Sequence, residues 1–153
     1  MRNLSSTLAV MALVTLCACD HDTTGPATRI NGSMSAVIDG AAWTALSIAT
    51  DSAAPSSIII QGSDATQRLV IAIPVDQGPG KQTVGSTTPV FAGLVIGSQS
   101  WLASRTQGGA GSVTLTTAAR GHIAGTFEFT LAAHEGALPA DRRVSSGRFD
   151  VKY

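Results

Sequence analysis

The sequence predicts an all-β fold, an antiparallel β-sandwich or small barrel of about 8–10 short strands. Charged residues make up 13% of the chain and aromatic residues 5%, and 16 glycines accompany many β-branched residues. This composition favours short strands and tight turns over long helices. Short apolar segments recur between turn sequences, and none has the sustained periodicity of an amphipathic helix.

Residues 1–18 are expected to form an export signal. Arg2 supplies a short positive start, and Leu4 to Leu16 then form an apolar run diluted by a few hydroxyl residues. The run has about 13 residues, whereas a membrane-spanning helix needs about 20. A charged start followed by a short apolar run is typical of a cleaved signal peptide.

The apolar run ends in Leu16-Cys17-Ala18-Cys19, which is similar to the bacterial lipobox. The resemblance implies that Cys19 becomes the lipid-bearing first residue, because cleavage before Cys17 would place Leu16 at the small-residue position. It also implies a diacylglyceryl thioether and often a third, amide-linked chain. Two or three acyl chains hold a protein on a membrane far more durably than one. The alternative is an ordinary secretory signal with two incidental cysteines.

Residues 19–32 are expected to be a lipid-anchored flexible linker, because they are polar and contain Gly25-Pro26. The expected location is the cell envelope, with the protein exported and anchored at the periplasmic face or the cell surface. Asp20 follows the expected lipid acceptor, but its meaning for membrane sorting is not general, so inner and outer membranes both stay open. Because lipid would occupy Cys19, no disulfide is expected in the mature chain.

Residues 33–153 are expected to form the all-β domain, which begins with a hairpin. Asp39-Gly40 suits a two-residue turn because both residues tolerate positive φ. This turn pairs Ile38 with Ala41 and Ala36 with Trp43, and paired residues share a face of the sheet. The resulting apolar side places Trp43 in the core and comprises Met34, Ala36, Ile38, Ala41, Trp43 and Ala45.

Further strands are expected at intervals bounded by turns, at 58–61, 68–73, 90–96, 100–105, 112–117 and 122–131. The last of these alternates cleanly between two faces. Its apolar face is Ile123, Phe127, Phe129 and Leu131, and its polar face is His122, Thr126, Glu128 and Thr130. The C-terminal segment continues this alternation, with Phe149, Val151 and Tyr153 inward and Arg148, Asp150 and Lys152 outward. Ala132 to Arg143 is expected to be a surface loop.

Three segments together span most of residues 33–153: the Met34–Ala45 hairpin, Gly111–Thr116, and His122–Phe129 followed by Gly147–Val151. On these segments the domain resembles an uncharacterised family of small bacterial lipoprotein domains of unknown function. The resemblance implies an envelope-anchored β-sandwich. It carries no activity and no functional residues to transfer.

No catalytic or metal-binding constellation is evident, so we expect neither an enzyme nor a cofactor. His21, His122 and His134 are scattered, without the spacing of a zinc site. His122 and Glu128 lie six residues apart, about 20 Å along a strand, and cannot act as a pair. His134-Glu135 lies in the expected loop and is the least unfavourable candidate for a hydrolase.

Trp101 and Arg105 are the candidate ligand contacts. Alternation places Trp101 on the face opposite Leu102. If Leu102 faces the core, Trp101 is exposed near Arg105 and could form a platform for a sugar or peptide. The favoured interpretation is that Trp101 itself faces the core, because large aromatic residues are usually well buried.

The function expected from these observations is that of a membrane-anchored envelope lipoprotein that binds or scaffolds another envelope component without catalysis. The alternatives are a glycan-binding module and, less favoured, a hydrolase. Ten basic and ten acidic residues give a formal net charge of zero. Nucleic acid is not an expected partner, because its binding calls for a basic surface.

Overall fold

The computed structural model describes residues 32–54, 56–85 and 90–153, so the expected signal peptide, Cys19 and all but the last residue of the linker lie outside the described residues. The described residues form eleven strands and no helix. None of their segments is a helix long and apolar enough to cross a membrane. The strands are β1 (Gly32–Ile38), β2 (Ala41–Thr44), β3 (Ser47–Ala54), β4 (Ser57–Ser63), β5 (Gln67–Pro74), β6 (Gly80–Thr83), β7 (Phe91–Ile96), β8 (Gln99–Ala103), β9 (Ala110–Ala119), β10 (His122–His134) and β11 (Asp141–Lys152).

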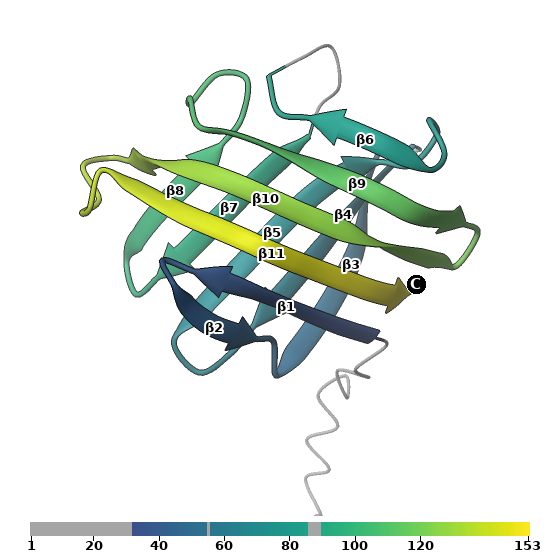
Figure 1. Cartoon of the computed structure of the whole chain (residues 1–153), viewed down its shortest axis with the longest axis horizontal. Coiled ribbons are helices and arrows are strands. Elements are labelled where there is room, and N and C mark those ends of the chain that lie inside the picture. Colours follow the sequence, from purple (N-terminus) through teal and green to yellow (C-terminus); the bar gives the residue numbers. More distant parts are fainter. Residues whose placement is uncertain (1–31, 55, 86–89) are drawn as a thin grey trace, which may run out of the picture.

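All eleven strands belong to one antiparallel sheet in the order β2-β1-β11-β10-β8-β7-β5-β4-β3, with β9 beside β10 and β6 beside β9. The long β10 joins two parts of this sheet. Its residues 122–130 pair with β9, whereas Ala132–His134 pair with β8. The sheet therefore branches at β10 and curls into a half-barrel. In Figure 1 the strands β6, β9, β10, β11, β1 and β2 form a front layer, and β8, β7, β5, β4 and β3 lie behind it.

The all-β, antiparallel prediction is confirmed, but the strand number of about 8–10 is too low. Two strands escaped prediction, β3 and β6. The sequence of β3 contains Ile48 as its single large apolar residue, and β6 has four residues after a Gly-rich turn. Neither segment buries enough apolar surface to show the alternation by which strands are recognised.

The expected surface loop from Ala132 to Arg143 is shorter than predicted. β10 continues to His134 and β11 begins at Asp141, which leaves residues 135–140 as the connection. Ala132 pairs with both Asp141 and Leu102 in the sheet. The residues at these two strand ends are alanines and charged residues, so the sequence shows no apolar alternation there. The strands continue nevertheless, because their backbones still pair.

The first hairpin has the predicted register, with Ile38 opposite Ala41 and Ala36 opposite Trp43. Asp39 and Gly40 have φ values of 49° and 87°, as a two-residue turn with two left-handed residues requires. Trp43 is buried as expected, whereas Ala41 is exposed at the tip. The turn sequence and the apolar alternation thus specify the same pairing.

The core fills the concave side of the curled sheet. The predicted inward residues of β10 and β11 are buried, and Phe127 stacks on Phe129 and Phe149 with ring centroids 5.8 Å and 6.2 Å apart. Burial of one such side chain contributes about 1.5–3 kcal/mol. Tyr153, also expected inward, is 47% exposed, because it follows Lys152, the last residue of β11, and lies beyond the strand.

Candidate functional site

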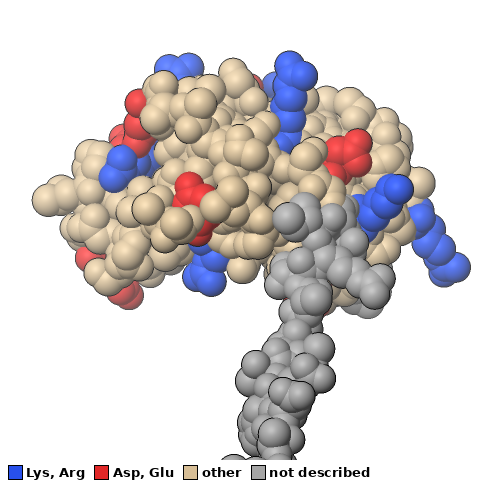
Figure 2. Space-filling model, turned by 90° about the horizontal axis from the view of Figure 1, so that it is seen from below, with Lys and Arg blue, Asp and Glu red and all other residues tan. Residues whose placement is uncertain are grey.

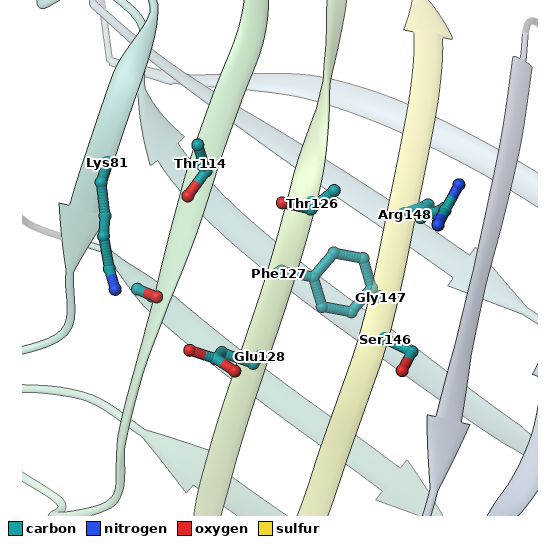
Figure 3. Close-up of a pocket in the computed structure, with 9 residues that line it drawn as sticks. Lys81, Thr114, Thr126, Phe127, Glu128, Ser146, Gly147 and Arg148 are labelled. Carbon is teal, nitrogen blue, oxygen red and sulfur yellow. The ribbon is translucent and has the colours of Figure 1, made fainter.

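A hollow of about 410 Å³ lies on the outer face of the front layer, across four neighbouring strands (Figure 3). β6 and β9 supply one side, and β10 and β11 supply the other. It is lined by Lys81, Ser112, Thr114, Thr126, Phe127, Glu128, Ser146, Gly147 and Arg148. The hollow is polar, apart from the edge of one buried phenyl ring.

Strand register aligns the lining residues in rows across the sheet. Lys81 is opposite Thr114, which is opposite Thr126, which is opposite Arg148. Side chains directly opposite one another project from the same face. The row therefore has two short hydroxyl side chains in the middle and a long cationic side chain at each end. This difference in length creates the hollow, and Figure 3 shows Lys81 and Arg148 on its opposite sides.

A second row contains Ser112 opposite Glu128, with a β-bulge of β11 beyond it. The register of β11 shifts against both β10 and β1 at this point. Ser146 in the bulge has a φ of 52°, a left-handed conformation that is uncommon outside glycine. Bulges re-aim side chains and are frequent beside functional sites. Here the bulge places Ser146 at the rim of the hollow.

The floor of the hollow depends on the absence of a side chain at Gly147. A Cβ atom at this position would lie 2.3 Å from carbon atoms of the Phe127 ring. The Phe127 ring lies next to Gly147 in Figure 3, between β10 and β11, and its side chain is almost completely buried. The ring therefore forms the floor of the hollow, but too little of it is exposed to offer a ligand an apolar surface.

The charges around the hollow are not paired with one another. The ion pairs among the residues that the structure places are His122–Asp150, His134–Glu135 and Arg142–Asp39. Lys81, Glu128 and Arg148 belong to none of them. The hydroxyl groups of Thr114, Thr126 and Ser146 have no hydrogen-bond partner among the described residues. These groups are available to a ligand without breaking an internal contact.

A second hollow of about 210 Å³ continues the first beyond Glu128, which lines both. Thr130 and Arg143 are opposite one another there, beside Ala110. The outer face of β9, β10 and β11 thus carries a polar trough longer than one hollow.

Trp101 is fully buried, which confirms the expectation that it faces the core. Its Nε1–H donates to the Pro139 carbonyl at 2.7 Å, and the Arg142 guanidinium lies 4.5 Å from the ring centroid. An exposed platform is therefore not available at Trp101. Arg105 is exposed in the turn after β8 and lies outside the polar trough.

Arg142 is also the partner of Asp39 at the turn of the first hairpin, with Nη1 2.6 Å from Oδ2. The Arg143 backbone N–H donates to Oδ1 of the same carboxylate at 2.8 Å. Partial burial raises the pKa of Asp39, but the hydrogen bonds from Arg142 and Arg143 and the Arg142 charge outweigh it and hold the pKa below 3.8. These contacts fasten the β1–β2 turn to β11.

The other polar residues singled out from the sequence do not converge. His122 Nε2 lies 3.0 Å from Asp150 Oδ1 on the exposed surface. His134 contacts Gln107 at 3.2 Å and its neighbour Glu135 at 3.5 Å. No group of three or more His, Cys, Asp or Glu residues suited to a metal ion occurs in the described part of the chain.

Sequence reasoning placed Thr126, Glu128 and Arg148 on an outward face but did not identify them as a site. Lys81 was missed altogether, because β6 was not predicted. The alternation of hydroxyl residues at Ser112 and Thr114 was a usable indication of an outward polar face. Which strands lie beside one another, however, is a property of the fold and not of any one segment.

A comparison with protein-family profiles matches residues 31–149 to a family described as "Domain of unknown function (DUF6252)". Neither a search of curated proteins nor a search of solved structures found a match.

Proposed function

The chain belongs to the DUF6252 family of domains of unknown function, and from this premise we propose that it is a lipid-anchored bacterial envelope protein. Its β domain binds or scaffolds another envelope component and catalyses no reaction. The membrane, reached through the acyl chains, is its first partner, and an envelope protein or glycan is the second.

The observation that carries the proposal is the sequence Leu16-Cys17-Ala18-Cys19 at the end of a charged start and a short apolar run. Acyl chains on Cys19 would fix the chain at the envelope surface, since each buried methylene contributes about 0.8 kcal/mol. Polar residues follow up to β1, which begins at Gly32. Such a segment would separate the domain from the bilayer.

The polar trough supports a binding role for the domain. It extends over four strands, and its charged groups lie on three of them, β6, β10 and β11, instead of converging on one point. Nucleophilic or general acid–base catalysis needs a base within hydrogen-bond reach of the group it activates. Acidic and basic residues are also interspersed on the face seen in Figure 2, with no continuous basic surface for nucleic acid.

A second candidate function is that of a glycan-binding module, and the hydroxyl groups of the trough favour it. The sequence directed this hypothesis to Trp101 and Arg105. Because the Trp101 ring is buried, the candidate glycan site is instead the outer face of β9, β10 and β11.

The anchor is tested with two matched cysteine variants in a bacterial host, labelled with a radioactive fatty acid. Wild type and Cys17→Ser are expected to incorporate label and to sediment with membranes. Cys19→Ser is expected to lose the label and to accumulate as unprocessed precursor. Equal labelling of Cys19→Ser, or no labelling of wild type, would contradict the proposal.

A further inference from the structure

We infer that the hollow around Thr114 and Thr126 binds an acidic glycan, an extended oligosaccharide whose sugar hydroxyls alternate with carboxylate groups. The inference rests on the proposed binding role of the domain and names the ligand class and the residues. The one juxtaposition that carries it is the row Lys81, Thr114, Thr126 and Arg148, with Glu128 beside its middle.

The two cations define the length and charge of the ligand. Lys81 and Arg148 stand on β6 and β11, three strand spacings apart, which is about 14 Å at about 4.8 Å per spacing. A single small anion cannot reach both, but a short oligosaccharide lying across the strands can. Carboxylates spaced along it would pair with the ammonium of Lys81 at one end and the guanidinium of Arg148 at the other.

The residues in the middle of the hollow favour ligand hydroxyl groups over ligand carboxylates. Thr114 and Thr126 each offer a donor and acceptors, and the Glu128 carboxylate offers acceptors alone. Sugar hydroxyls can donate to Glu128, whereas a phosphate or carboxylate there would be repelled. A glycan with acidic groups separated by neutral, hydroxyl-rich stretches fits this order of charges better than a uniform polyanion does.

Other ligand classes fit the hollow less well. Phe127 is its single large apolar lining residue and is 3% exposed, so an acyl chain or apolar side chain would bury little surface. A peptide added as a strand needs free backbone groups at a sheet edge. β9, β10 and β11 each have a paired strand on both sides along the hollow, so their backbone groups already bond within the sheet.

The test is a calorimetric titration of the full chain, purified in mild detergent as cells process it, with an acidic hexasaccharide in which glucuronic acid alternates with neutral N-acetylglucosamine. Maltohexaose is the neutral probe of equal length, and poly-glutamate is the carboxylate polymer without sugar. We expect the acidic hexamer to bind, more weakly as salt rises, and both other probes to bind at least tenfold more weakly or not at all. Binding of maltohexaose or poly-glutamate as tight as that of the hexamer would overturn the inference.

Charge-removing variants locate the site. Lys81→Gln and Arg148→Gln are each expected to weaken hexamer binding about fivefold. Lys152→Gln is the matched control, because Lys152 is exposed on the same face of β11 but outside the hollow. It is expected to leave the affinity unchanged. Equal weakening by Lys152→Gln would show diffuse charge attraction, and no effect of Lys81→Gln or Arg148→Gln would remove the site from this hollow.

The ligand inference and the proposed anchor fail separately. A lipid-bearing chain that does not bind the acidic hexamer would overturn the inference and leave the anchored binding role intact. A chain that binds the hexamer through Lys81 and Arg148 but carries no lipid would support the inference and overturn the proposed anchor.

Discussion

Gly147 acts on both the core and the surface trough. Its missing side chain lets the Phe127 ring pack directly beneath the backbone of β11, next to Phe129 and Phe149. The same position adjoins Ser146, the bulge residue at the rim of the hollow. A larger residue here must displace either the aromatic stack or the strand.

Gly147→Ala is therefore expected to lower the free energy of unfolding by about 2 kcal/mol, because its Cβ would overlap a ring that is packed on all sides. Gly93→Ala is the comparison. The nearest atoms there are side-chain carbons of Leu102 and Phe91 at 3.2 Å and 3.3 Å, which can yield by a few tenths of an ångström. Urea unfolding checks both, and a Gly147→Ala midpoint no lower than that of Gly93→Ala would contradict this account of the floor.

Asp39 makes part of the stability dependent on pH. Its pKa in the folded protein lies below the ordinary value of an aspartate, so the carboxylate contributes stability above that ordinary pKa, and the contribution is lost as pH falls through the folded pKa. Asparagine tolerates the positive φ and can still accept the Arg143 N–H. Asp39→Asn is thus expected to cost about 0.5–1 kcal/mol at neutral pH.

The difference between wild type and Asp39→Asn should shrink as the pH is lowered from about 5 to about 2. Urea unfolding at several pH values measures it, with the exposed Asp76→Asn as control. A constant difference across that range would show that the Asp39 charge has no part in holding the hairpin to β11.

At the scale of elements, a residue of β8 fixes the connection between β10 and β11. Trp101 on β8 donates its indole N–H to Pro139 in the connection, and Ala133 N–H donates to the Ala140 carbonyl. Arg142 covers the indole ring and reaches Asp39 at the neighbouring turn. Residues 135–140 are therefore expected to be well ordered although they project from the sheet.

Trp101→Phe removes the donor to Pro139 and part of the buried volume, and we expect a loss of about 2 kcal/mol. Hydrogen exchange should quicken at residues 135–140 beyond the global change. Trp43→Phe, at the other buried tryptophan, is expected to destabilise the domain without this local effect. Equal exchange at 135–140 in the two variants would mean that Trp101 does not hold the connection.

Elements with a strong alternation were predictable, and those specified by their neighbours were not. The Asp39-Gly40 hairpin and the two faces of β10 follow from turn chemistry and period-two burial. β3 and β6 have few apolar residues and are strands because β4 and β9 offer them backbone partners. The site follows the same division. Thr126, Glu128 and Arg148 were placed outward, but only the register across β6, β9, β10 and β11 brings Lys81 to them.

At the scale of the whole molecule, the proposed function combines a lipid anchor at Cys19 with a domain that has an open polar face. β1 begins beside the end of β11, with Gly32 opposite Val151, so the chain enters the domain near its C-terminus (Figure 1). The trough lies on the outer face of the front layer, and Gly32 is not among the residues that line it.

The proposed lipid anchor is tested by intact-mass and N-terminal peptide spectrometry of the wild-type chain, recovered from the membranes of the bacterial host. The expected first residue is Cys19 with a mass that includes a diacylglyceryl group, and residues 1–18 are expected to be absent. A chain recovered from the medium with an unmodified thiol at Cys19 would contradict the proposal that the domain is attached to a membrane.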